Sequence, residues 1–137
     1  MLVMGILNAT PDSFADGGEH FTYPDAVDHG LQLIAEGADI IDVGGESTRP
    51  GAERVSSAEE ERRVVNVISK LADAGKPISI DTMRASTARA AVIAGASIIN
   101  DVSGGLADPA MLDTAAELKV PYIAMHWRGH SKDMNNL

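Results

Sequence analysis

The sequence contains no cysteine, few aromatic residues and no long apolar run. Without cysteine, disulfide bonds, thiolate metal sites and cysteine nucleophiles are all excluded. No stretch approaches the ~20 apolar residues of a membrane-spanning helix, and the first residues are typical of a strand rather than a signal peptide. The net charge of -9 argues against nucleic acid as a partner. We therefore expect a cytoplasmic globular protein with no membrane contact.

Several common site motifs are also missing. The chain has no Walker loop, no G-x-G-x-x-G, no G-x-S-x-G and no H-E-x-x-H. His126 and His130 are four residues apart, but nothing is spaced to complete a metal site around them, which favours loop histidines. The 137 residues suffice for one domain, yet they are close to half of the roughly 250 residues of an eightfold β/α barrel.

Short apolar strands alternate with amphipathic helices along the chain. The spacing predicts strands at residues 2–7, 39–43, 77–80, 97–99 and 120–125. Helices are predicted from residue 24 to 37, from the Ser56–Ser57 caps to about 74, from about 84 to 94, and from 109 onward. This alternation predicts an α/β fold with a parallel sheet.

The sequence also predicts which residues of the helices are exposed, which are buried and which cap a helix end. The run from Glu59 to Arg63 is typical of a solvated helix face. Asp108, followed by Pro109, is expected to be the N-cap of the last helix. Apolar residues at helical spacing predict the buried face of the first helix: Val27, Leu31, Ile34 and Ala38.

A polar or small residue follows each predicted strand. Because the carboxyl ends of parallel strands meet at one edge, where α/β proteins bind ligands, we expect these side chains to converge. Each one alone is also an ordinary turn residue, since Asn, Asp and Gly are common in turns. Their occurrence after all five strands favours a binding site. These residues are Asn8, Gly44-Gly45-Glu46, Asp81-Thr82, Asn100-Asp101 and His126.

Two connections at this edge are longer than a usual βα loop. They span residues 9–23 and 44–55, contain glycines, and are typical of substrate loops. Arg49 in the second loop is one of only two basic residues among the first 61. It is expected to contact an anionic group, with a solvated arginine as the alternative.

These residues resemble the signature motifs of dihydropteroate synthases, a family of folate biosynthesis, over essentially the whole chain. Trp127 stands where many members carry Met. The resemblance implies the first half of a (β/α)8 TIM barrel, from its first to its fifth strand, within one pterin-binding domain over residues 1–137. The matching motifs are M-G-I-L-N-A-T-P-D-S-F at 4–14 with D-G-G at 16–18, D-V-G-G-E-S-T-R-P-G at 42–51, S-I-D-T at 79–82, N-D-V-S-G-G at 100–105, and Met125-His126.

In that family, 6-hydroxymethyl-7,8-dihydropterin diphosphate condenses with p-aminobenzoate to give 7,8-dihydropteroate and pyrophosphate. The bond cleavage is dissociative and needs no protein nucleophile or general base, which agrees with the lack of such motifs. Positioning, electrostatics and Mg²⁺ supply the acceleration. The resemblance therefore implies a transferase and sulfonamide target with Mg²⁺ as cofactor and two small-molecule substrates; no residue is assigned as catalytic. A homodimer is one possible assembly of the protein.

The resemblance also implies roles for residues in the later motifs. Asp81 would accept paired hydrogen bonds from the amino-pyrimidinone edge of the pterin, because a carboxylate only accepts. Asn100 would offer a donor and an acceptor to the ring nitrogens. Val102 and Met125 would line the apolar faces of the ring. Asn8 would meet Mg²⁺ and the diphosphate through its amide oxygen.

The two long loops are expected to hold the other groups. Thr48 and Arg49 would hold the diphosphate or p-aminobenzoate, while Phe14 and Asp16 would close over the aminobenzoate pocket. Later strands of the family contribute another pterin Asp, a Lys, and an Arg with a Ser-x-His group, none of which can be located in this sequence. We therefore predict little or no synthase activity for this chain alone.

Two alternatives remain open on the sequence. A methyltetrahydrofolate-dependent methyltransferase of the same superfamily would share the pterin Asp and Asn, but not the S-T-R-P-G loop. A non-catalytic half-barrel would bind pterin or assemble with a partner, because five parallel strands cannot close a small barrel and leave apolar edges.

Overall fold

A computed structural model describes residues 2–9, 23–45 and 56–124 of the chain. Strands and helices alternate as the sequence predicts, and a short 3₁₀ turn, η2 (Ala72–Ala74), follows the second helix. The strands are β1 (Met4–Asn8), β2 (Ile40–Gly44), β3 (Ile78–Asp81), β4 (Ile98–Asp101) and β5 (Tyr122–Ala124). The helices are α1 (Tyr23–Ala35), α2 (Ser57–Leu71), α3 (Ala85–Ala94) and α4 (Met111–Leu118).

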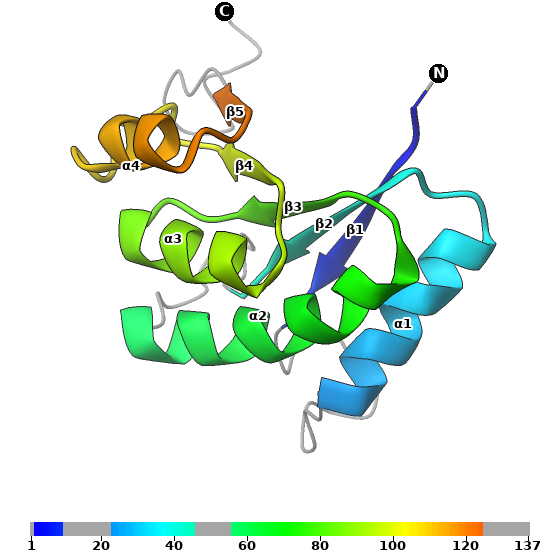
Figure 1. Cartoon of the computed structure of the whole chain (residues 1–137). Helices are drawn as coiled ribbons and strands as arrows, with labels where there is room; N and C mark the ends of the chain where they lie inside the picture. Colours follow the sequence, from blue (N-terminus) through cyan, green and yellow to red (C-terminus); the bar gives the residue numbers. More distant parts are fainter. Residues whose placement is uncertain (1, 10–22, 46–55, 125–137) are drawn as a thin grey trace, which may run out of the picture.

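The strands form one parallel sheet in which the spatial order equals the chain order, β1 to β5. Figure 1 shows α1, α2 and α3 along one side of this sheet, with α4 beside β4 and β5. A doubly wound fold would instead reverse its strand order and carry helices on both faces. The α/β barrel arrangement predicted from the sequence is therefore confirmed, and β1 and β5 are the open edges of its first half.

Strand pairing divides the sheet residues into two rows on opposite faces. Side chains alternate along each strand, so residues that pair across strands share a face. An outer row faces the helices and lies in the apolar core: Leu7, Val43, Ile80 and Ile99. An inner row lies on the other face, at the carboxyl ends of the strands: Asn8, Gly44, Asp81, Asn100 and Ile123.

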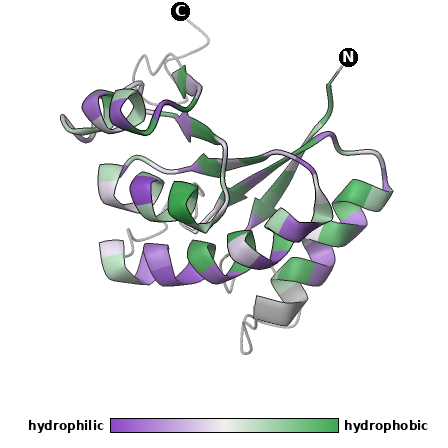
Figure 2. Ribbon diagram, in the orientation of Figure 1, coloured by the Kyte–Doolittle hydropathy of each residue, from purple (hydrophilic) through white to green (hydrophobic). Residues whose placement is uncertain are grey.

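The helix α2 shows how local sequence and packing agree. The Ser56 hydroxyl accepts a hydrogen bond from the Glu59 N–H at 3.1 Å, the N-cap that the sequence predicts. Its apolar face packs against the sheet, and Figure 2 shows hydrophobic colouring along the strands with hydrophilic residues mainly on the helices. The buried apolar residues of α2 are Val64, Val67, Ile68 and Leu71.

The predicted buried face of α1 is wrong at one residue. Leu31 is exposed, whereas Val27, Ile34 and Ala38 contact the core as expected. Gly30 explains the difference, because a Cβ there would lie 2.7 Å from a methyl carbon of Leu71. At this point α1 packs against Leu71 of α2 through the backbone of Gly30, and the side chain of the next residue, Leu31, lies outside this contact.

The predicted role of Asp108 is also wrong. The N-cap of α4 is Ala110, and no side chain caps that helix. The Asp108 carboxylate instead accepts a hydrogen bond from the Ala85 N–H at 2.7 Å, at the first residue of α3, and another from the Ala110 N–H at 3.0 Å. The carboxylate thus ties the loop before α4 to the preceding helix. No helix in the described parts of the chain is long and apolar enough to span a membrane.

Candidate functional site

The inner row brings three of the predicted site residues side by side. Asn8 pairs with Gly44, Gly44 with Asp81, and Asp81 with Asn100. Each lies within its strand rather than just after it, so the strands run slightly farther than the sequence predicts. Gly44 lies between Asn8 and Asp81 in this row, and a Cβ there would be in ordinary van der Waals contact with the Asp81 carboxylate, at 3.6 Å from one of its oxygens.

The three polar side chains differ in burial and in hydrogen bonding. Asn8 is exposed and Asp81 is half-buried, whereas Asn100 is only 8% exposed. The Oδ1 atom of Asn100 is buried and accepts no hydrogen bond from any of the described residues. A buried acceptor without a donor costs free energy, so a ligand that supplies an N–H at this point would relieve that cost.

Asp42 lies behind this row, two residues before the end of β2. It is 3% exposed and accepts hydrogen bonds from the Ser79 hydroxyl and from Nδ2 of Asn100, the latter at 3.3 Å. Burial raises the pKa of Asp42, and the hydrogen bonds from Ser79 and Asn100 oppose that rise. Asp42 is the first residue of the motif at 42–51, but no role in the site was predicted for it. Its signal was a carboxylate inside an otherwise apolar strand, at the spacing that places it on the inner face.

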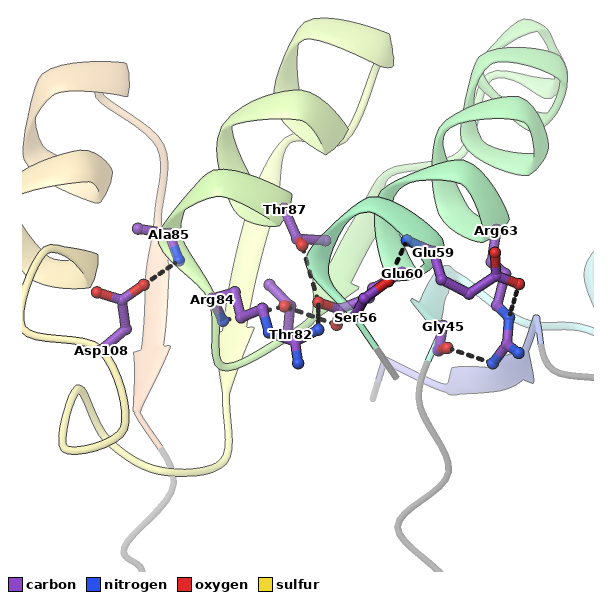
Figure 3. A network of polar contacts seen from close by, with 10 residues as sticks. All are labelled: Gly45, Ser56, Glu59, Glu60, Arg63, Thr82, Arg84, Ala85, Thr87 and Asp108. Carbon is purple, nitrogen blue, oxygen red and sulfur yellow. Dashed lines mark hydrogen bonds and ion pairs between the residues drawn. The ribbon is translucent and has the colours of Figure 1, made fainter. Parts of the chain in front are cut away.

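Glu60 lies at the centre of a second polar network, on the helix side of the sheet (Figure 3). Its side chain accepts hydrogen bonds from the hydroxyls of Thr82 and Thr87, both at 2.8 Å, and from the Arg84 guanidinium at 3.2 Å. Glu60 is 2% exposed, so the prediction that residues 59–63 form a solvated face is wrong here. The residue stands four positions before Val64, on the buried face of the helix.

The Glu60 network holds the segment that follows Asp81. The Thr82 hydroxyl also accepts a hydrogen bond from the Arg84 N–H at 3.1 Å, and the Thr82 N–H donates to the Asn100 carbonyl at 3.2 Å. Thr82 thereby connects Glu60 on α2 and Asn100 near the end of β4 to the end of β3. The backbone that presents Asp81 and Asn100 is fixed from behind by these contacts.

The first turns of α2 also fix the end of β2. The Arg63 guanidinium donates to the Gly45 carbonyl and to the Glu59 carboxylate, each at 3.0 Å (Figure 3). A Cβ on Gly45 would lie 2.9 Å from a methyl carbon of Val64 and 3.0 Å from the Glu60 carbonyl oxygen. Glycine is therefore needed for this close approach, immediately before the long loop that carries Thr48 and Arg49.

Asp101 organises the loop after β4, which carries Val102. Its buried carboxylate accepts hydrogen bonds from the Ser103 N–H at 2.9 Å, the Ser103 hydroxyl at 2.7 Å and the Gly105 N–H at 2.9 Å. The Tyr122 hydroxyl also donates to it at 2.9 Å. Burial, and then the hydrogen bond and charge of Asp101, raise the pKa of Tyr122 to about 12. Asp101 is thus a loop support rather than a free group at the edge.

The other predicted site residues lie outside the described part of the chain. Within residues 2–9, 23–45 and 56–124, no group of three or more His, Cys, Asp or Glu side chains could hold a metal ion. The structure thus adds Asp42 and Glu60 to the surroundings of the site, and gives Asp101, which the sequence already predicted at this edge, a supporting role. The predicted residues outside the description are Phe14, Asp16, Glu46, Thr48, Arg49, Met125 and His126.

Comparison with known proteins gives consistent matches. A family model described as pterin binding enzyme matches residues 4–137. The dihydropteroate synthase of Mycobacterium leprae (strain TN) is 56% identical over 126 residues, which cover 92% of this chain and 44% of that protein. The match lies in the N-terminal part of the relatives.

Two solved structures show the same relation. Dihydropteroate synthase of Xanthomonas albilineans with 4-aminobenzoic acid has a TM-score of 0.87 and 53% identity, over 96% of this chain and 50% of that chain. The Yersinia pestis enzyme with a sulfonamide drug complex has a TM-score of 0.84 and 43% identity, over 99% of this chain and 49% of that chain. The chain therefore spans about half the length of the proteins it matches.

Proposed function

Because this chain belongs to the pterin binding enzyme family, we propose that it forms the N-terminal half of a dihydropteroate synthase barrel. The identity to proteins of that name supports the proposal at the level of sequence. The inner row supports it at the level of chemistry, and the unpartnered Oδ1 of Asn100 is the observation that carries it. A flat heterocycle with several edge N–H groups is the kind of ligand that such a row of acceptors would bind.

In this proposal, Asp81 and Asn100 bind the edge of the dihydropterin. Asp81 accepts from two N–H groups, while Asn100 accepts through Oδ1 and donates through Nδ2. Val102 contributes to an apolar wall beside the ring. The p-aminobenzoate nitrogen forms a bond to the pterin methylene carbon as the carbon–oxygen bond to diphosphate breaks. The described residues act by holding the ring in place for this exchange.

Asn8 is a suitable magnesium ligand but does not form a magnesium site by itself. It is exposed at the carboxyl end of β1 and offers one amide oxygen, a hard donor of the kind Mg²⁺ prefers. Mg²⁺ usually keeps several waters and shares one or two protein ligands with substrate phosphates, so one amide fits a metal that arrives with the diphosphate. When bound, the metal would neutralise charge on the departing pyrophosphate. The roles of Thr48, Arg49, Phe14, Asp16 and Met125, a homodimer and a cytoplasmic location stay predictions from the sequence.

The non-catalytic half-barrel has one observation in its favour. β1 and β5 are the edge strands of the sheet among the described residues, and apolar side chains of the inner face, Ile6 and Ile123, are substantially exposed. A partner could cover that face. No feature of the described residues favours the methyltransferase over the synthase.

The proposal is tested by comparing two aspartates in the complete barrel protein. Asp81→Ala should weaken binding of the dihydropterin diphosphate by about 100-fold, because it removes an ionised acceptor for two donors. Asp28→Ala, on the exposed side of α1, is the matched control and should leave binding unchanged. Isothermal titration calorimetry would measure both, and equal affinities would refute the role of Asp81.

A second experiment separates the synthase from the half-barrel. The 137-residue chain alone should show no turnover with both substrates and Mg²⁺, whereas the complete barrel should produce 7,8-dihydropteroate. Turnover by the chain alone would contradict the prediction that later strands are needed. An inactive complete barrel that still binds pterin would favour the non-catalytic alternative.

A further inference from the structure

The contact between Asp42 and Asn100 has a consequence for ligand choice. Asp42 is buried on β2, and its Oδ1 atom lies 3.3 Å from Nδ2 of Asn100 on β4. The bond crosses β3, where Ser79 donates its hydroxyl to the same carboxylate oxygen. One N–H of the Asn100 amide is therefore used inside the protein, while its Oδ1 is unused.

The chemistry of a carboxylate decides how the amide of Asn100 is turned. A carboxylate can accept hydrogen bonds but cannot donate them, so only the NH₂ end of the amide is attracted to Asp42. Rotating the amide by half a turn would bring two oxygen acceptors together in a buried place, which is unfavourable at low dielectric. Asp42 thus selects one of two nearly isosteric orientations of the side chain.

We propose that Asp42 is a positioning residue that sets which heterocycle edge Asn100 can bind. With its orientation fixed, Asn100 presents an acceptor and its second N–H side by side. That pair matches an exocyclic amino group next to a ring nitrogen, as Asn matches adenine in DNA recognition. It does not match an edge in which a carbonyl replaces the amino group, because two acceptors would then face each other.

The inference rests on the proposed function and adds a specificity to it. The site should distinguish a 2-amino-4-oxopteridine from its 2,4-dioxo counterpart, and Asp42 should be the origin of that distinction. Asp81 alone would not supply this distinction. A carboxylate only accepts hydrogen bonds, so it binds any heterocycle edge that offers it N–H groups.

The test compares two probes on the complete barrel protein, 6-hydroxymethylpterin and 6-hydroxymethyllumazine, by isothermal titration calorimetry. The unmodified protein should prefer the pterin by at least about tenfold in Kd. In Asp42→Asn, the new amide can donate to Oδ1 of Asn100, so both orientations become acceptable. The preference should then fall to about threefold or less, while the affinity for p-aminobenzoate stays unchanged.

Ser79→Ala is the matched control, because it removes a neighbour of Asp42 and leaves the bond to Asn100. Its preference should stay within about twofold of the unmodified protein. If Asp42→Asn does not fold, Asp42→Ser gives the same test, because its shorter side chain removes the carboxylate oxygen that attracts the NH₂ end of Asn100.

The possible results separate this inference from the function on which it rests. An unchanged preference in a folded Asp42 variant, or an equal loss in Ser79→Ala, would overturn the positioning role of Asp42. A protein that binds neither pteridine would instead overturn the proposed function.

Discussion

The two faces of the sheet differ in how far their apolar side chains are buried and their polar groups are hydrogen-bonded by the described residues. On the outer face, Leu7 is fully buried and the carboxylate of Glu60 accepts from three donors. On the inner face, Ile6 is 53% exposed and Asn100 retains an unused buried acceptor. The outer face is thus built for stability within the chain. The inner face presents groups that no other described residue covers or pairs.

The largest expected effect on stability is that of replacing Glu60, the centre of the polar network on the outer face. Glu60→Ala should lower the free energy of unfolding by about 4 kcal/mol, because it removes the acceptor shared by two buried hydroxyls and one ion pair of Arg84. Urea unfolding followed by circular dichroism would measure this. Glu59→Ala is the control one residue away, and loss of its exposed ion pairs should cost less than about 1 kcal/mol. Similar costs for both would mean that the outer network is not a stabilising centre.

Adjacent residues of β1 give the most direct comparison of the two faces. Leu7→Ala should cost about 3 kcal/mol, because it opens a cavity in the core. Ile6→Ala in the same chain should cost less than about 1 kcal/mol, because its side chain is half exposed. In the complete barrel, where later strands would cover the inner face, the cost of Ile6→Ala should rise. Equal costs in the chain alone would contradict the division into two faces.

The pH dependence of stability should reveal the buried carboxylate of the inner face. Because burial raises the pKa of Asp42 in the folded state, the folded protein binds more protons than the unfolded chain between the two pKa values. The free energy of unfolding contributed by this group is therefore present at low pH and falls as pH rises through that window. The effect is modest, because hydrogen bonds from Ser79 and Asn100 oppose the rise.

Asp42→Asn should remove this contribution. Urea unfolding between pH 3 and pH 8 should give a difference between variant and parent that changes with pH in the acid range and becomes constant above it. Asp28→Asn, which makes the same replacement at an exposed position of α1, is the control. A difference that changes with pH no more for Asp42→Asn than for the control would show that burial does not perturb this carboxyl.

The smallest effect is expected at the cap that joins two helices on the outer side. Asp108→Ala should cost about 1 kcal/mol, because the Ala85 N–H at the start of α3 loses its acceptor. Hydrogen bonds from Ala85 and Ala110 lower the pKa of Asp108, so this stabilisation is present at neutral pH and is lost as pH falls through the folded value. Thermal unfolding at pH 7 would measure it. Asp113→Ala, in the first turn of α4, should cost less.

Local periodicity was enough to predict the elements of this fold. The strands and helices lie within a few residues of their predicted positions, and Ser56 caps α2 as expected. The convergence of Asn8, Asp81 and Asn100 also followed from the sequence, because parallel strands place their carboxyl ends together whatever the details of packing.

The sequence predictions for Glu60 and Leu31 were wrong because the environment of each residue depends on distant parts of the chain. Glu60 was assigned to a solvated face because its neighbours are charged, yet it accepts hydrogen bonds from Thr87 on α3 and from Thr82 in the segment after β3. Leu31 matched a helical apolar pattern, but α1 packs against Leu71 through the backbone of Gly30, and the side chain of Leu31 lies outside this contact. Neither contact can be read from spacing, because spacing describes one helix at a time.

The sequence by itself determined the class of fold, the family and the edge at which the polar residues meet. Periodic apolar residues and strand-end side chains are local properties, and they need no knowledge of what packs against them. Only the tertiary structure decided which carboxylates are buried and what they hold, with Asp42 against Asn100 and Glu60 against Thr82. The physical reason is that the cost of burying a charge, and the donors that offset it, are set by segments far apart in the chain.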